Sequence, residues 1–205
     1  MSINYDYDEN AGAHADDVAN RIDQCGAYIG EFTVVNAMES SKGTQGIHFE
    51  FTSPGGGTAS FDCWTEKTDD DGNPKTLFGL NQVQAMMSIL GVRGLKSEPG
   101  EVEEWVDGKR VKVEGDRFPA LEKKKIGLVL QRENYSKQDN SDGFRMNLFG
   151  VFHAESRLTA SEIKERKVAP EKLEKMLRGL KTKDSRVARI AEPAQPPMGA
   201  AAGGY

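Results

Sequence analysis

The sequence predicts a mainly β fold with a few helices: a five-stranded barrel, a helix between its third and fourth strands, and a C-terminal helical extension. Runs rich in β-branched and aromatic residues, separated by glycine-rich turns, predict the strands. One stretch with helical spacing divides these runs into two groups and so places the helix. A chain of 205 residues, 37% hydrophobic and 29% charged, suits one globular domain with tails.

The first three strands are predicted over residues 27–38, 46–52 and 58–65. The first is rich in Tyr, Ile, Phe, Thr and Val, which suit a pleated strand. In the second, apolar and polar residues alternate, so one face points to a core. That alternation favours core positions for Phe49 and Phe51.

The helix is predicted between Asn81, whose side chain can cap its start, and Gly91, which can end it at the C′ position. An Asp-Gly pair at 107–108, flanked by strand-like residues, predicts a β-hairpin. Two further strands are predicted over Lys125–Gln131 and Phe144–Phe152. A long polar loop, residues 132–143, joins them.

Composition divides the chain into four segments. These are an acidic N-terminal arm (1–24), the barrel domain (25–155), a basic helical extension (156–190) and a disordered tail (191–205). The tail is Pro, Ala and Gly with almost no large apolar residue, so it cannot offset the entropy lost on ordering.

The helical extension combines apolar spacing with basic charge. Thr159 and Glu162 have the spacing of a capping box. Residues 164–189 hold ten basic and four acidic residues, an excess of 10 − 4 = 6 positive charges. A second helix, Pro170–Leu180, either adds phosphate affinity or packs on the barrel or another subunit. Packing is favoured, and it would use Leu173, Leu177 and Leu180.

Three strands, one helix and then more strands is the element order of the OB-fold, which binds ligands on a strand face and its neighbouring loops. A closer resemblance is carried by residues 26–28, 39–44, 126–135, 143–148 and 158–162. In these segments the chain resembles bacteriophage OB-fold single-stranded DNA-binding proteins, with similarity spanning residues 25–163. The resemblance implies a part in phage DNA replication or recombination in the host cytoplasm, with replication or recombination proteins as further partners.

The C-terminus departs from a common pattern. Many bacterial single-stranded DNA-binding proteins end in an acidic tip that recruits partners, whereas residues 198–205 contain no acid. The resemblance therefore gives no support to recruitment by that route.

Binding a single strand needs flat rings that stack on bases and cations that follow phosphates. Trp64 has the strand parity of Ser60 and Asp62, which predicts an exposed ring on a polar face; the alternative is packing over a barrel end. Lys67 and Lys75 flank the next loop and can reach phosphates, unless that loop is only solvated. Lys42, in the first strand connection, is a weaker candidate.

The predicted loop 132–143 gives the second group of candidates. Tyr135 lies among three cations: Arg132, Lys137 and Arg145. An aromatic ring among cations on neighbouring strands predicts a nucleic-acid contact. The alternative is a hairpin tip with ordinary solubilising charge.

The sequence predicts no enzyme, metal or cofactor site. The three histidines are widely separated, Asp69–Asn73 lacks the twelfth-position glutamate of a calcium loop, and Gly55–Gly57 lacks the Gly-Lys that ends a P-loop. Cys25 and Cys63 form no CxxC pair, which indicates a reduced cytosolic protein.

No apolar run reaches the length of a membrane span, and residues 1–6 do not resemble a signal peptide. The net charge of −5 is unusual for a nucleic-acid binder. Two alternatives therefore stay open. One is a β-barrel protein-interaction module, such as a replisome or virion accessory factor; the other is a nuclease with clustered carboxylates.

Overall fold

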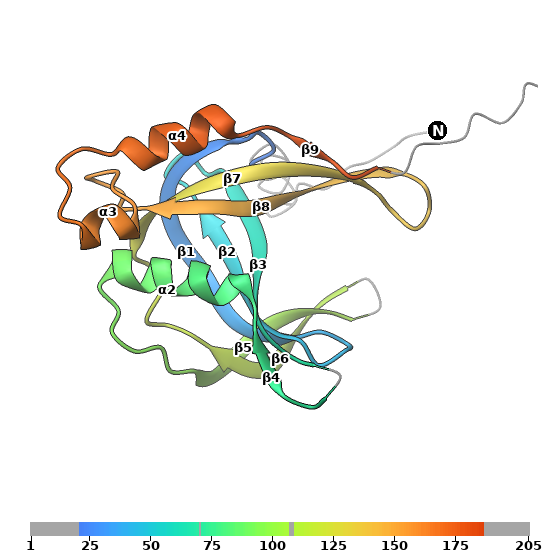
Figure 1. The fold of residues 1–205 in the computed structure, drawn as a ribbon. Helices are drawn as coiled ribbons and strands as arrows, with labels where there is room; N and C mark the ends of the chain where they lie inside the picture. The colour runs from blue at the N-terminus through green and yellow to red at the C-terminus, as the bar shows by residue number, and fades with distance from the viewer. Residues whose placement is uncertain (1–20, 70, 107–108, 187–205) are drawn as a thin grey trace, which may run out of the picture.

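The computed structural model describes residues 21–69, 71–106 and 109–186 (Figure 1). Most of the predicted acidic arm and all of the predicted disordered tail lie outside them. The strands are β1 (Gly26–Glu39), β2 (Gln45–Thr52), β3 (Thr58–Thr68), β4 (Pro74–Thr76), β5 (Glu98–Val106), β6 (Lys109–Arg117), β7 (Lys125–Ser136), β8 (Asp142–Phe152) and β9 (Lys183–Asp184). The helices are α2 (Phe78–Leu90), α3 (Ala160–Lys164) and α4 (Glu171–Gly179).

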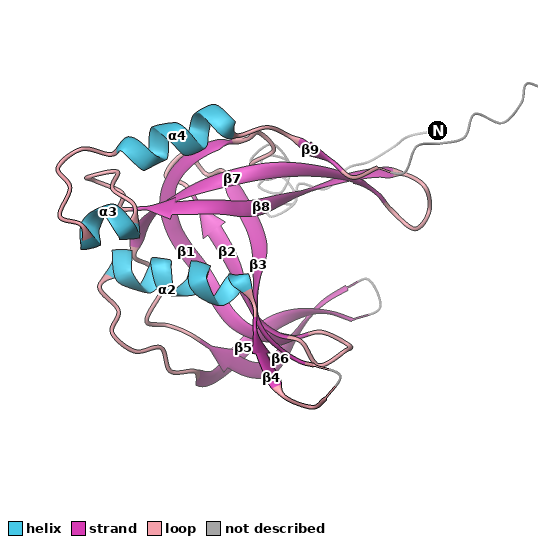
Figure 2. Ribbon diagram, in the orientation of Figure 1, coloured by secondary structure: helices cyan, strands magenta, loops and turns pink. Residues whose placement is uncertain are grey.

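The described chain is mainly β with three helices, as predicted, and its strands form one sheet (Figure 2). The strand order is β4-β3-β2-β1-β6-β5, and β7 pairs with β1, β8 and β9. All pairings between these strands are antiparallel except that of β7 with β9.

The described chain has nine strands, whereas the sequence predicts seven: five in the barrel and two in the hairpin around residues 107–108. The short β4 lies between β3 and the helix, and the hairpin β5–β6 joins β1 only at Asn36↔Arg117. Strand β3 packs against β8. No hydrogen-bonded pairing joins these two strands in the described part of the chain, so the sheet is open at this seam.

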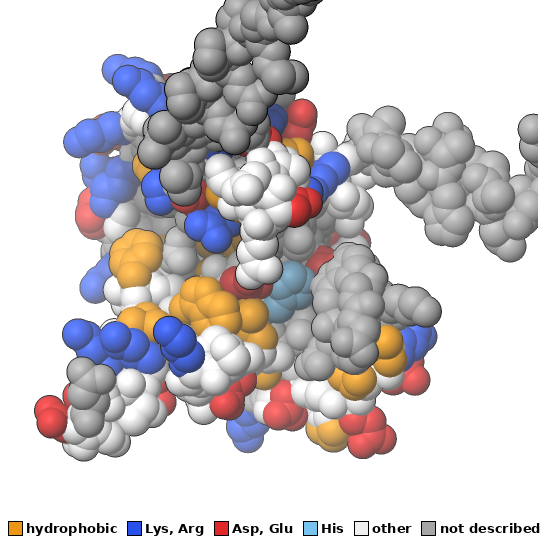
Figure 3. Space-filling model, turned by 90° about the vertical axis from the view of Figure 1, so that its right-hand side faces the viewer, with side chains coloured by type: hydrophobic (Ala, Val, Ile, Leu, Met, Phe, Trp, Pro, Cys, Tyr) orange, Lys and Arg blue, Asp and Glu red, His pale blue; other side chains and the backbone are white. Residues whose placement is uncertain are grey.

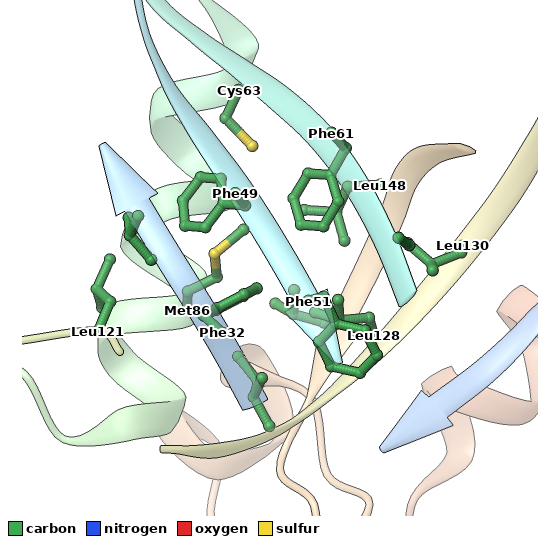
Figure 4. Close-up of a cluster of buried hydrophobic side chains, with 14 of the residues drawn as sticks. Phe32, Phe49, Phe51, Phe61, Cys63, Met86, Leu121, Leu128, Leu130 and Leu148 are labelled. Carbon is green, nitrogen blue, oxygen red and sulfur yellow. The ribbon is translucent and has the colours of Figure 1, made fainter. Parts of the chain in front are cut away.

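The inner faces of β1, β2 and β3 carry the core (Figure 4). The rings of Phe49 and Phe61 stack with centroids 5.3 Å apart, and the Phe32 centroid lies 4.9 Å from that of Phe49. Phe49 is fully buried and Phe51 is 1% exposed, so both predicted core positions are confirmed. Helix α2 closes this side with its apolar face. The buried residues of that face are Val83, Met86 and Ile89.

Helix α2 begins earlier than predicted. Its N-cap is Leu77, without a side-chain cap, so Asn81 lies inside the helix and the predicted capping role is wrong. Tight packing fixes this start, because a Cβ on Gly79 would lie 2.2 Å from the carbonyl oxygen of Trp64. The predicted end is confirmed: Gly91 has φ 68°, and its N–H bonds the Met87 and Ser88 carbonyls.

The hairpin β7–β8 is longer than the sequence predicts. Pairing continues through Glu133↔Arg145 to Ser136↔Asp142, so the predicted loop 132–143 shrinks to residues 137–141. The polar residues of this extension are stable in strands because their side chains have hydrogen-bond partners on the paired strand and their backbone also pairs with β9. In Figure 1 this hairpin and the hairpin β5–β6 project from the same side of the molecule.

The helical extension packs on the sheet. Leu173 of α4 is 1% exposed and lies in a cluster with Val129 and Phe152, joined by Leu177 and Leu180. The favoured packing role of this helix on the sheet is therefore confirmed. The predicted capping box is present at Thr159. Its partner, the fully buried Glu162, accepts hydrogen bonds from the Thr159 N–H and hydroxyl at one oxygen and from the Lys172 N–H at the other.

The described end of the predicted acidic arm belongs to the same unit. Ile22 is 7% exposed within the main core cluster. Its N–H donates to the Thr58 carbonyl, and Arg21 forms a parallel bridge with Thr58. The globular unit therefore begins at least at residue 21, before the predicted boundary at residue 25.

Candidate nucleic-acid interface

The outer face of β3 points away from the core, on the side from which both hairpins project. Along β3, Thr58, Ser60, Asp62 and Trp64 alternate with three buried residues of the inner face. Those buried residues are Ala59, Phe61 and Cys63. The predicted parity of Trp64 with Ser60 and Asp62 is thus confirmed. Figure 3 views this side of the molecule, where apolar side chains lie next to lysines and arginines.

Four predicted site residues lie at one end of this sheet, which we name the lysine end: Lys42, Trp64, Lys67 and Lys75. Lys67 and Lys75 are direct partners across β3–β4, and both are exposed. Lys42 lies in the turn that joins β1 to β2. No described carboxylate forms an ion pair with any of these lysines. Like charges directly opposite each other destabilise a strand pair, and an anion bound between Lys67 and Lys75 would relieve this repulsion.

Trp64 is half-buried rather than exposed. Its ring lies beside Gly46, its partner on β2; a Cβ at that position would come within 2.9 Å of Trp64 Cε3 and 3.4 Å of Met38 Cγ. Gly46 thus leaves room for the ring beside the sheet. The Trp64 side chain therefore lies on the outer face, as predicted, and its ring also packs beside the sheet at Gly46.

The second group centres on Phe144, a ring whose role the sequence leaves undecided. The guanidinium carbons of Arg21 and Arg132 each lie 4.4 Å from the centroid of the Phe144 ring. Arg21 also donates to the Phe144 carbonyl at 3.5 Å, and Arg132 donates to the Asp23 carbonyl at 3.0 Å. We name Arg21, Arg132 and Phe144 the arginine clamp.

The predicted cluster of Arg132, Tyr135 and Arg145 is divided between two faces of the β7–β8 hairpin. Side chains alternate along a strand, so Arg132 points to one face and Tyr135 to the other. The Arg145 guanidinium carbon lies 5.8 Å from the Tyr135 ring centroid, on that other face. Lys137 is exposed in the loop 137–141. The structure thus brings Tyr135 together with Arg145 and separates both from Arg132, the one of the four that belongs to the clamp.

A buried carboxylate, Glu133, lies on the face of the hairpin that carries Tyr135. Glu133 is 3% exposed, and Arg145 lies 3.0 Å and Lys183 3.2 Å from its oxygens. Asn147 donates to it at 2.7 Å, and the Ser185 hydroxyl donates a further hydrogen bond. The Ser185 bond is the largest cause that lowers the pKa of Glu133 to about 2, helped by Asn147, Lys183 and Arg145 against burial. These contacts bind the C-terminal strand β9 to the hairpin.

The lysine end and the arginine clamp lie near opposite ends of β3. The clamp lies near Thr58 through Arg21, and Trp64 is six residues further along, about 20 Å at ~3.3 Å per residue. Acidic side chains occupy the surface between them. His48 Nδ1 lies 2.7 Å from Asp62 Oδ1, and His48 Nε2 lies 4.0 Å from Glu50 Oε1. The cations thus flank an anionic centre, so they form two separate contact points.

Sequence reasoning missed Arg21, which it placed in an acidic arm, and left Phe144 open. Their contact joins residues separated by 123 positions, so no local pattern could predict it. Strand parity, applied beyond residue 131, would have separated Tyr135 from Arg132.

No protein-family model matches this chain, and no curated protein matches it significantly. Among the described residues, none of the helices has the length and apolar character that crossing a membrane requires. Nor do three or more His, Cys, Asp or Glu side chains gather there in a way that could hold a metal ion.

Proposed function

We propose that this chain binds single-stranded DNA, with little sequence preference, across the outer face of β1–β2–β3. The observation that carries the proposal is that a ring lies with cations near each end of that face; among these cations, Arg132 also lies 3.8 Å from the Asp23 carboxylate. Trp64 lies with Lys42, Lys67 and Lys75 at one end, and Phe144 lies with Arg21 and Arg132 at the other. Rings and arginine planes stack on unpaired bases, and cations bind phosphates.

The proposal includes an OB-type barrel, open at the seam between β3 and β8. Its support is the order of three strands, a helix and two long strands, with β7 returning to pair with β1. In OB-folds the face of the second and third strands binds the ligand. Here that face lies between the lysine end and the arginine clamp. The resemblance to bacteriophage proteins supports a role in DNA replication or recombination in the host cytoplasm.

The acidic centre of the face shapes the proposed contact. Phosphates near Glu50 and Asp62 would be repelled. The DNA is therefore held at the two ends of this face, and between them its bases face the sheet. The contacts proposed at the two ends are rings, guanidinium planes and lysines, which can act on any base or phosphate. The binding is therefore expected to be salt-dependent and tolerant of sequence.

The lysine end supplies the first test. Replacing Lys67 and Lys75 together by glutamine should weaken binding of a fluorescent oligothymidine about fivefold at low salt, because two phosphate contacts are lost. The slope of log K against log salt should become shallower by about 1.4, or ~0.7 for each contact. Fluorescence anisotropy at several salt concentrations measures both quantities.

The matched control replaces Lys96 and Lys164, which are exposed outside this face, and removes the same charge. It should leave the slope nearly unchanged. Equal slopes for the lysine-end variant and the parent protein would show that these lysines touch no phosphate.

Trp64 gives a second prediction. Trp64→Ala should weaken oligothymidine binding about fivefold, near 1 kcal/mol, because the residue is already partly buried beside the sheet. The circular dichroism spectrum should not change. Unaltered affinity would exclude the indole from the binding surface.

The alternative function is a protein-interaction module without direct DNA contact. The acidic centre around Glu50 and Asp62 favours it, because such a surface repels phosphate. A gel shift with labelled oligothymidine at low salt separates the two functions. Absence of any shift would favour the interaction module.

A further inference from the structure

A second surface is an apolar groove between α2, β8, α3 and α4. Its volume is about 800 Å³. Apolar side chains line most of it: Phe78, Ala85, Phe149, Val151, Ala160 and Met176. We name it the helix groove.

Two exposed phenylalanines mark this groove. Phe78, at the start of α2, is 72% exposed, and Phe149 is 42% exposed. Phe149 is the extra residue of a β-bulge, since Val129 pairs with Gly150 and Leu130 with Leu148. The bulge leaves the ring of Phe149 at the surface while its neighbour Leu148 is buried. Exposed rings in one groove indicate an interaction site.

The rim of the groove is basic. Lys172 and Lys175 of α4 line it, and no acidic side chain is among its described lining residues. Lys175 forms no ion pair with a described carboxylate, whereas Lys172 lies 3.7 Å from Glu165 and donates to the Ser161 hydroxyl at 2.6 Å. The groove therefore suits a segment that presents apolar side chains on one side and carboxylates on the other.

The chain itself contains such a segment. Residues 1–20 hold five acidic residues and no lysine or arginine. Within them, Ile3, Tyr5 and Tyr7 alternate with three polar residues, two of them acidic. The polar residues are Asn4, Asp6 and Asp8. This alternation would place the apolar residues in the groove and the carboxylates beside Lys172 and Lys175.

The connection is long enough. Arg21 contacts Phe144 of β8, and Phe149 is five residues further along the same strand, about 17 Å at ~3.4 Å per residue. Residues 9–20 can span up to about 40 Å at ~3.3 Å each. Residues 3–8 can therefore reach the groove of the same molecule.

We propose that the acidic N-terminal segment, residues 3–8, docks in the helix groove of its own chain. Ile3, Tyr5 and Tyr7 cover Phe78 and Phe149, and the carboxylates of Asp6 and Asp8 pair with Lys172 and Lys175. Docking there keeps these carboxylates away from the lysine end and the arginine clamp, where they would compete with phosphate. The inference holds whether or not the chain binds DNA.

Hydrogen–deuterium exchange of the full chain at low concentration tests the proposal. Amides of residues 3–8 should exchange about tenfold faster in Phe78→Ser/Phe149→Ser, and also in Lys175→Glu, than in the parent protein. Both phenylalanines and Lys175 are exposed, so the fold should survive. Val168→Ser, which removes a 99% exposed apolar residue outside the groove, and Lys164→Glu should change nothing.

Three results would overturn the proposal. Equal exchange in the parent and the groove variants would show that the segment does not dock there. Faster exchange in Lys67→Glu/Lys75→Glu instead would place it on the lysine end. Protection that grows with protein concentration would make the occupant a second copy of the chain.

Discussion

Replacing Arg132 and Phe144 together by alanine is expected to weaken binding of oligothymidine about thirtyfold. The change removes Arg132, whose guanidinium plane can stack on a base, and the ring that Arg132 and Arg21 both contact. Stacking contributes about 1–3 kcal/mol per base, and a loss of ~2 kcal/mol corresponds to about thirtyfold in affinity. Anisotropy titration at low salt measures the effect.

A control variant removes one exposed arginine and one exposed apolar side chain elsewhere. Arg166 and Val168 are exposed and do not line the helix groove, so Arg166→Ala/Val168→Ala should bind DNA like the parent protein. Tyr135→Ala gives a second comparison, because Tyr135 lies on the opposite face of the hairpin from the clamp. If the clamp variant and Tyr135→Ala lose equal affinity, the DNA does not distinguish the two faces of the hairpin. The clamp would then not be the DNA contact.

Glu133→Gln is expected to lower the free energy of unfolding by about 2 kcal/mol at pH 7. The substitution keeps the shape of the side chain but removes the charge that Arg145 and Lys183 share. The pKa of Glu133 is lowered from 4.5 to about 2 in the folded protein, mainly by the Ser185 hydrogen bond. Both cationic partners are more than half exposed, so the expected loss is smaller than the full pKa shift implies.

The same shift predicts a pH dependence. Because the folded-state pKa is below the unfolded value, the carboxylate contributes its full stability above about pH 4.5. This contribution is lost as the pH falls from 4.5 toward 2. Urea unfolding of parent and variant should therefore give a difference that shrinks between these values.

The exposed Glu165 supplies the control, since Glu165→Gln should change stability by less than about 0.5 kcal/mol. A difference between parent and Glu133→Gln that is as large at pH 2.5 as at pH 7 would contradict the assigned role of the charge.

Local patterns predicted the parts of the fold that depend on local physics. Alternation identified β2, and the Asp-Gly pair at 107–108, which lies outside the described residues, predicted the hairpin in which β5 pairs with β6. Gly91 ended its helix because only a residue that tolerates a left-handed backbone fits there. The capping box at Thr159 followed from spacing alone.

The misses have a common cause in contacts between distant residues. Polar residues 132–136 resembled a loop because the partners that keep Glu133 in a strand, Lys183 and Ser185, come from about 50 positions away. Arg21 reaches Phe144 across 123 positions. The bulge that exposes Phe149 interrupts strand alternation, and no sequence pattern marks it. The arginine clamp, which is one of the two parts of the candidate site, could therefore be identified only from the three-dimensional structure.

Photo-crosslinking of the full chain to an oligothymidine, followed by peptide mapping, tests the central claim most directly. We expect crosslinks in two peptides, one containing Trp64 and one containing Phe144, and competition by unlabelled single strands. Crosslinks confined to other parts of the chain, or none above the level seen with duplex DNA, would contradict the proposed interface.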